Sequence, residues 1–212
     1  WYADEGGFYF VGTDGKEVTK QLEENPKVEL CFFNNAADPA EIVMGSSATA
    51  LLQMLARCFA QVLGPGDEII VTNGDHEANI GPWLELERTG AIIKFWNVAP
   101  DSCELLLDDL IALLGPRTRL VTLTHASNIL GAINPIRSIA NIVHQTGAWL
   151  CVDGVALAPH RAIDVQALDV DFYALSCYKC FGPHHALLYG KREHLLELPG
   201  QNHFFIADDD IP

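Results

Sequence analysis

A lysine near the end of the chain has the surroundings of a reactive amine. Lys179 follows an apolar run that ends at Ser176, and a Gly-Pro turn comes shortly after it, at residues 182–183. At the edge of a sheet such a lysine can be desolvated, which disfavours the ammonium form and frees the amine to attack an aldehyde. Most lysines that follow strands are only solvated charges, so Lys179 needs support from other residues.

The same stretch permits a metal or redox interpretation. The potential zinc ligands are Cys177, Cys180, His184 and His185. The two cysteines flank Lys179, and the Gly-Pro turn leaves little freedom for the four side chains to converge on a tetrahedral site. A thioredoxin-like dithiol would have to open a helix after a strand near the start of a βαβ unit. We therefore predict no metal site and favour chemistry at the lysine.

Five ordered motifs resemble the class V aminotransferase family, within the branch of cysteine-desulfurase-like proteins that has tyrosine before the cofactor lysine. The motifs occupy residues 45–49, 75–83, 127–131, 152–160 and 176–183. The resemblance runs from about residue 35 to residue 212. It implies the fold type I of enzymes that use pyridoxal 5'-phosphate (PLP), with Lys179 holding this cofactor as a Schiff base. Five motifs in order are far more specific than any one alone.

The resemblance also implies roles for polar residues in these motifs. Asp153 would pair with the pyridine nitrogen and keep it protonated, so that the ring can accept electrons. His76 would lie over the cofactor ring and move protons, and Asn128 would donate to the phenolic oxygen. Each residue has an ordinary alternative as well, namely a turn, cap or exposed loop residue.

The cofactor phosphate would lie at the start of a helix. Ser47, together with the backbone N–H groups of Ser47 and Ala48, stands at a predicted helix N-terminus, which suits an anion. Simple N-capping by Ser47 is the alternative, and it is compatible with phosphate binding. Ser176 and Tyr178 match positions that contact the phosphate in the family, although either hydroxyl also has a structural interpretation.

Strands and helices alternate from about residue 46 onward. Apolar runs predict strands at residues 68–72, 91–96, 119–124, 148–152, 171–175 and 186–189. Helical patterns with caps predict helices at residues 48–63, 79–88, 108–114 and 135–146. This order predicts an α/β fold with a mostly parallel sheet and helices on both faces. Ligands of such sheets bind beyond the carboxyl ends of the strands, which is where the motifs fall.

The first 33 residues follow a different pattern. Residues 6–11, 17–24 and 28–33 predict a strand, a helix and a strand. This segment resembles a fragment of the FMN-binding split barrel of pyridoxamine-phosphate-oxidase-like proteins. A fragment of this length cannot close a barrel or enclose a flavin. We therefore expect an N-terminal arm over residues 1–34, followed by the PLP-binding large domain over residues 35–212.

The composition is that of a globular protein. The 212 residues are 49% hydrophobic, and the net charge is −15. Such an acidic balance argues against nucleic acid or an anionic membrane surface as a partner. No run approaches the roughly 18 apolar residues of a membrane helix, and the N-terminus lacks the layout of a signal peptide. Because the six cysteines are scattered, we expect reduced thiols and a cytoplasmic location.

The resemblance implies a cysteine desulfurase or selenocysteine lyase, which converts L-cysteine or a similar amino acid to alanine and enzyme-bound sulfur. Two alternatives stay open: another PLP reaction (transamination, epimerisation or β-elimination) and a catalytically inactive cofactor-binding domain. Family members form homodimers. Their small domain, nucleophilic cysteine and carboxylate-binding arginine lie in the C-terminal part. We expect these beyond Pro212, because none of the six cysteines matches the position of the nucleophile.

Overall fold

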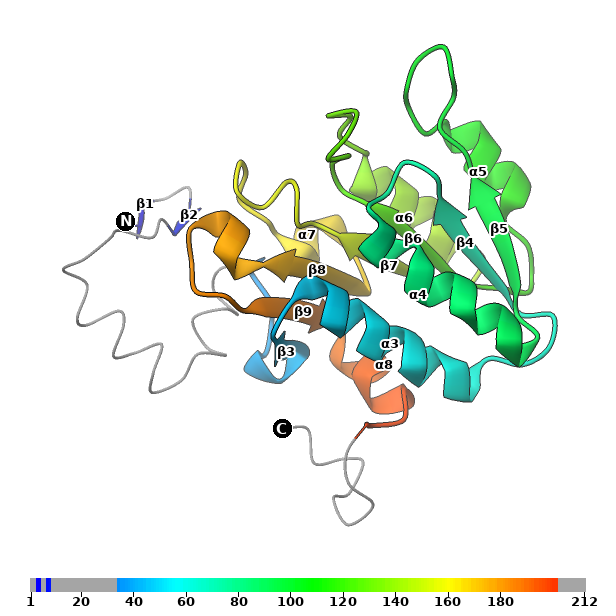
Figure 1. Ribbon diagram of the computed structural model, residues 1–212, viewed down its shortest axis with the longest axis horizontal. Helices are drawn as coiled ribbons and strands as arrows, with labels where there is room; N and C mark the ends of the chain where they lie inside the picture. Colours follow the sequence, from blue (N-terminus) through cyan, green and yellow to red (C-terminus); the bar gives the residue numbers. More distant parts are fainter. Residues whose placement is uncertain (1–2, 5–6, 9–33, 202–212) are drawn as a thin grey trace.

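The computed structural model describes residues 3–4, 7–8 and 34–201 (Figure 1). Its main sheet has seven strands in the order β3-β9-β8-β7-β6-β4-β5. The strands are β3 (Ile42–Gly45), β4 (Glu68–Thr72), β5 (Ile92–Trp96), β6 (Thr118–Thr124), β7 (Trp149–Asp153), β8 (Phe172–Ser176) and β9 (Ala186–Gly190). Strands β4 to β8 run parallel, whereas β9 pairs antiparallel with both β8 and β3. The predicted α/β fold with a mostly parallel sheet is confirmed.

Helices cover both faces of this sheet (Figure 1). They are α3 (Ala48–Val62), α4 (Gly81–Leu84), α5 (Leu107–Leu113), α6 (Ile136–His144), α7 (Val165–Leu168) and α8 (Arg192–Glu197). Short 3-10 helices lie in the connecting segments: η1 (Pro39–Glu41), η2 (Glu77–Asn79), η3 (Glu85–Thr89) and η4 (Cys177–Cys180). One core cluster packs α3 and α4 on the sheet, and a second packs α5, α6 and α7 on its other face.

Strand β7 shows why the central strands are apolar throughout. Leu150 and Val152 face the cluster under α6, whereas Cys151 between them faces the cluster under α3. All three are fully buried. Because successive side chains of a strand point to opposite faces, a sheet covered on both sides needs an unbroken apolar run. The buried run holds β7 in place, and Asp153 is the last residue of this strand.

Most predicted elements are found within one or two residues of the expected bounds, and β4 has the bounds expected. The predicted helix over residues 79–88 is wrong as a single helix, because the structure divides this region into η2, α4 and η3. The structure adds β3, α7 and α8, which were not predicted. Of the predicted N-terminal elements, the helix at 17–24 and the strand at 28–33 lie outside the described residues.

Near the N-terminus, β1 (Ala3–Asp4) and β2 (Gly7–Phe8) form a separate antiparallel pair. The longest helix of the described part, α3, has 15 residues. None of the helices that the structure describes has the length and apolar character needed to cross a membrane.

Candidate active site

The strand order creates a crevice at the carboxyl edge of the sheet. From β4 the chain moves outward to β5 and then returns to the other side of β4 as β6. The loops after β4 and β6 therefore leave the sheet in opposite directions, and ligands of open α/β sheets bind at such switch points. His76 follows β4, and Asn128 follows β6.

A cavity of about 100 Å³ lies at this edge. Its lining residues are Ala48, Thr49, His76, Ala78, Thr124, Asn128, Asp153, Val155, Ala156, Ser176, Tyr178 and Lys179. Seven of the eight site residues predicted from the sequence are among them, and Ser47 is the exception. Segments far apart in the sequence thus converge on one cavity.

Asp153 is the buried acid of the cavity, at the end of β7. Burial raises the pKa of its carboxyl, while the N–H of Val155, which donates to Oδ1 over 2.9 Å, acts in the opposite direction. The charge of Lys179, and that of His76 whenever its ring is protonated, also favour the ionised form of Asp153. Asp153 and Lys179 therefore line the same cavity and are close enough to interact electrostatically. A single ligand in this cavity would have both groups within its reach.

The ring of Tyr173 packs against the turn that follows Asp153. A Cβ atom on Gly154 would collide with the ring of Tyr173. The Tyr173 hydroxyl makes a 2.9 Å hydrogen bond with Nδ1 of His125. Burial, and to a smaller degree the charge of Arg161, lowers the pKa of His125 to about 4, so its ring is neutral at pH 7. Neither Tyr173 nor His125 was predicted as a supporting residue, because only their burial beside Asp153 reveals the role.

Lys179 lies on η4 and is exposed in the structure. The desolvation expected from its sequence context is therefore not found: the described residues do not bury the amine. Cys177 and Cys180 on the same turn pack against the apolar core, and burial raises the pKa of both thiols. Burial thus disfavours both thiolates, whereas Tyr178 and Lys179 of η4 are exposed and line the cavity.

The four potential zinc ligands near Lys179 are not arranged as a site. His184 stacks on the ring of Tyr178, with ring centroids 4.7 Å apart, while the thiols of Cys177 and Cys180 face the core. Within the described ranges, no three or more His, Cys, Asp or Glu side chains are grouped to hold a metal ion.

The start of α3 differs in detail from the expectation. Ser47 is the N-cap, as expected, but its hydroxyl accepts the N–H of Ala50 over 3.1 Å, and its side chain is not part of the cavity lining. Ala48 and Thr49 line the cavity instead. An anion at this 15-residue helix would therefore meet the backbone N–H groups of Ala48 and Thr49.

The donor set of the cavity fits PLP. A lysine amine suits the aldehyde, a buried carboxyl suits the ring nitrogen, and a helix N-terminus with nearby hydroxyls suits the phosphate. Ser176 and Tyr178 supply the hydroxyls. Thr49, Ala78, Thr124, Val155 and Ala156 line the cavity but were not predicted, since their residue types carry no chemical signal in the sequence.

Comparisons with known proteins agree with this geometry. The chain is 50% identical over 188 residues to the aminotransferase-like protein FGM3 of Gibberella zeae, covering 87% of this chain and 46% of that protein. It is 42% identical to the cysteine desulfurase-like protein ustD of Aspergillus flavus, with 87% and 44% covered. The cysteine desulfurase CsdA of Escherichia coli has a similar structure, with a TM-score of 0.82, 32% identity and coverage of 94% and 52%.

The chain thus spans about half the length of these relatives. The family model for aminotransferase class-V matches residues 11–202. This range includes part of the segment compared with a split barrel, so the boundary near residue 34 stays a prediction. With nearly the whole chain matched, the protein belongs to the aminotransferase class-V family.

Proposed function

We propose that the protein is a PLP-dependent enzyme of the cysteine desulfurase or selenocysteine lyase type. It would act on L-cysteine or a similar amino acid and give alanine and enzyme-bound sulfur. The observation that carries this proposal is the single cavity that brings together Lys179, Asp153 and His76. CsdA is named a cysteine desulfurase, and ustD is named a cysteine desulfurase-like protein. The similarity of the chain to both supports this reaction class.

The bound cofactor would supply an aromatic ring that accepts electrons from the amino acid. Lys179 would hold the cofactor covalently through its amine, and the same amine would accept and return a proton of the substrate. Asp153 would hold a proton on the ring nitrogen. His76 would lie over the ring, and Asn128 would donate its amide N–H to the phenolic oxygen.

The phosphate end would be fixed by neutral donors. The backbone N–H groups of Ala48 and Thr49 and the hydroxyls of Ser176 and Tyr178 are the groups at the cavity suited to this task. Because backbone N–H groups at a helix start have fixed directions, they would also set the orientation of the whole cofactor.

We also propose a homodimer and a cytoplasmic location. The exposure of Lys179 supports a dimer, because a second subunit would cover an amine that this chain leaves open. The five cysteines of the described residues are free thiols, as is usual for proteins of the reducing cytoplasm. Light scattering with and without PLP tests the first proposal, and microscopy of a tagged protein tests the second.

The cofactor assignment is tested by absorption spectroscopy with added PLP. We expect visible absorbance that is stable to gel filtration, and borohydride reduction should fix the cofactor on the peptide that contains Lys179. Lys179→Ala should abolish both signals, whereas Lys191→Ala, which changes a lysine of the opposite sheet edge, should keep them. A label on any other lysine would contradict the assignment.

The substrate class needs a separate measurement. Alanine released from L-cysteine, compared with release or conversion of other amino acids, distinguishes desulfuration from other PLP reactions. A chain that binds PLP at Lys179 but turns over no amino acid would instead support the inactive cofactor-binding domain.

A further inference from the structure

A buried cluster of polar side chains lies beneath the turn that carries His76. At its centre is Asp75, which is 5% exposed and accepts three hydrogen bonds. The Thr72 hydroxyl (2.5 Å) and the Thr124 backbone N–H (3.0 Å) donate to Oδ1, and the Asn79 amide donates to Oδ2 (2.6 Å). One carboxylate therefore joins β4, β6 and η2.

The amide of Asn79 has its orientation fixed from the opposite side. Its Oδ1 accepts the indole N–H of Trp83 (3.2 Å) and the hydroxyl of Thr122 (2.9 Å). Because an indole nitrogen only donates, the amide oxygen must face Trp83 and the NH₂ group must face Asp75. Every group that meets the Asp75 carboxylate is thus a donor.

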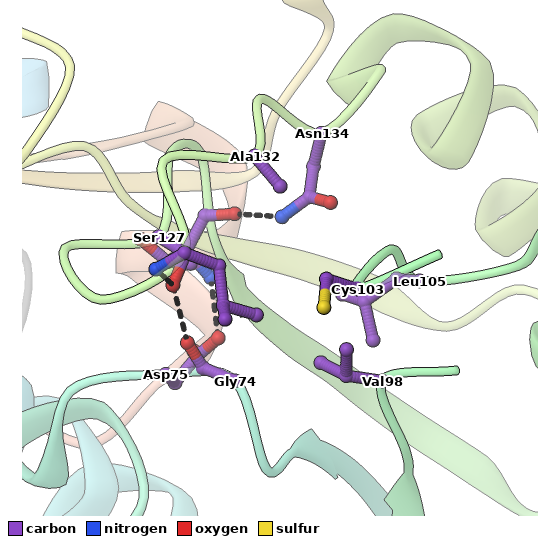
Figure 2. Close-up of a pocket in the computed structure, with 10 residues that line it drawn as sticks. Gly74, Asp75, Val98, Cys103, Leu105, Ser127, Ala132 and Asn134 are labelled. Atoms are coloured by element: carbon purple, nitrogen blue, oxygen red, sulfur yellow. Dashed lines mark hydrogen bonds between the residues drawn. The ribbon is translucent and has the colours of Figure 1, made fainter. Parts of the chain in front are cut away.

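A further contact restrains the same turn. The Ser127 hydroxyl donates to the Gly74 carbonyl over 3.1 Å, and Figure 2 shows these residues facing one another beside Asp75. The cavity that they line has a volume of about 10 Å³. Such a void has room for about one water molecule, so the buried side of the turn, at Gly74 and Asp75, has little space in which to shift. Asn73 and His76 of the same turn are exposed.

His76 takes its position from these contacts. It is the N-cap of η2, and its Nδ1 accepts the N–H of Ala78 over 3.1 Å. Buried, hydrogen-bonded residues stand on both sides of it, Asp75 before and Asn79 after. Since Nδ1 accepts, the neutral ring carries its proton on Nε2.

A carboxylate at this buried place carries a desolvation cost. Burial raises the pKa of Asp75 to about 6 in spite of its three donors, and the nearby charge of Asp153 adds to the rise. An apolar side chain would avoid that penalty, but it would leave the donors of Thr72, Thr124 and Asn79 without an acceptor. The carboxylate ties the turn at residues 73–76 to strands β4 and β6.

We propose that Asp75 is a positioning residue: through Thr72, Thr124 and Asn79 it holds His76, in its Nε2–H form, against the cofactor cavity. This inference rests on the proposed function for its catalytic meaning. The placement of His76 itself is a property of the protein without cofactor and is measurable there.

The first test is Asp75→Asn. The new NH₂ group must face either the Asn79 amide or the donors of Thr72 and Thr124, so a donor meets a donor in both orientations. We expect the ring nitrogen signals of His76, assigned with His76→Gln, to leave the pure Nε2–H pattern in the ligand-free protein. We expect PLP affinity to fall about 10- to 100-fold.

A matched swap, Asp75→Asn together with Asn79→Asp, restores every hydrogen bond. The amide at 75 accepts from Thr72 and Thr124 and donates to the carboxylate at 79, which still accepts from Trp83 and Thr122. The His76 tautomer and PLP affinity should return to those of the original protein. Thr118→Val is the control, because Thr118 is buried at the opposite end of β6 and bonds Glu68.

The outcomes separate positioning from fold stability. Unchanged His76 signals in a folded Asp75→Asn variant, or a folded swap that leaves them displaced, would overturn the inference. If the single variant does not fold, the swap decides alone. Loss of the His76 pattern in Thr118→Val would also count against it. Failure of the unmodified protein to bind PLP would reject the proposed function, whereas the ligand-free signals would still decide the role of Asp75.

Discussion

Gly154 illustrates how tightly one residue of the site is determined. It follows the buried Asp153, and the ring of Tyr173 occupies the space into which a Cβ atom would project. A methyl group here must displace either the ring or the turn that aims Asp153. Because Tyr173 is itself fully buried and bonded to His125, neither can move freely.

Gly154→Ala should therefore lower the free energy of unfolding by about 3 kcal/mol, the upper part of the range for overpacked cores. Urea denaturation measures the change. Gly64→Ala is the control, since its new Cβ would stand 3.7 Å from Asp67, an ordinary contact, and should change stability by less than about 0.5 kcal/mol. Equal losses for the two variants would show that the collision is relieved at little cost.

The candidate site residues with distinctive chemistry could be predicted from the sequence. The residues that pack against them or bond to their neighbours could not. Lys179, Asp153 and His76 were recognised because their motifs occur in order, and the structure brings them to one cavity. Asp75 stood inside a recognised motif without an assigned role. Thr72 and Asn79, which donate to it, are three and four residues away, but the third donor, the Thr124 N–H, is 49 positions away. A contact of that kind leaves no trace in the local sequence.

At the scale of elements, predictability followed the apolar runs of the sequence, since β5 was predicted although only one of its five residues is buried. Strand β4 is buried at every position, so its apolar run marked both of its ends. Strand β3 has four residues, of which one is buried, and such a pattern is too short to distinguish from a loop. The region 79–88 was predicted as one helix, but Gly81 and Pro82 at the start of α4 divide it, because glycine disfavours helix and proline lacks an N–H.

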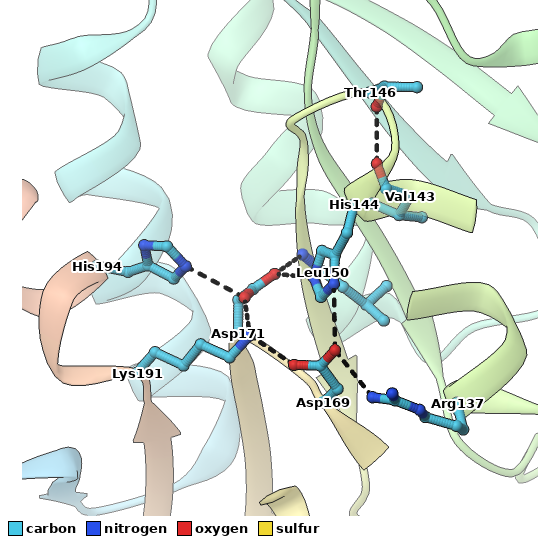
Figure 3. Close-up of polar contacts among 9 residues, drawn as sticks. All are labelled: Arg137, Val143, His144, Thr146, Leu150, Asp169, Asp171, Lys191 and His194. Atoms are coloured by element: carbon cyan, nitrogen blue, oxygen red, sulfur yellow. Dashed lines mark hydrogen bonds and ion pairs between the residues drawn. The ribbon is translucent and has the colours of Figure 1, made fainter. Parts of the chain in front are cut away.

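The elements at the opposite edge of the sheet are joined by a buried carboxylate (Figure 3). Asp171 precedes β8, and His144 from α6 and the N–H of Leu150 from β7 contact its Oδ2 at 2.8 and 2.7 Å. Lys191 and His194, next to and within α8, contact Oδ1 at 2.7 and 3.1 Å. Burial alone would raise the pKa of Asp171, but the hydrogen bonds from His144, His194 and Lys191 outweigh it and lower the pKa.

This lowered pKa predicts a pH dependence of stability. In the unfolded chain Asp171 titrates near pH 4 (about 3.9), and in the folded chain it titrates at lower pH. Its contribution is therefore complete above about pH 4 and is lost as the pH falls from there toward the folded pKa. Asp171→Asn should lower the free energy of unfolding at pH 7 by about 3 kcal/mol.

Urea denaturation between pH 7 and pH 2 measures both effects. The original protein should lose stability more steeply below pH 4 than Asp171→Asn, so the two curves converge in acid. Asp164→Asn is a control on an exposed N-cap carboxylate, which makes one backbone hydrogen bond to Ala167. Parallel curves for the original protein and Asp171→Asn would show that Asp171 is not the titrating group.

The whole molecule encloses its cofactor cavity only in part. The volume is about 100 Å³, whereas cofactor sites usually measure about 300–1,000 Å³. Lys179 and Asn128 at its rim are exposed, and the chain spans about half the length of its relatives. If this cavity holds the proposed cofactor, groups outside the described residues complete the site, and the proposed homodimer would supply them from a second subunit.

That arrangement couples cofactor affinity to assembly. If the partner subunit covers the cavity, PLP binds the dimer more tightly than the monomer, and by linkage each bound PLP must promote dimerisation by the same factor. Fluorescence titrations of PLP at increasing chain concentration should show a falling apparent Kd over the range in which light scattering detects the dimer. An apparent Kd that stays constant across that range would place both halves of the site within one chain and remove the physical reason for a dimer.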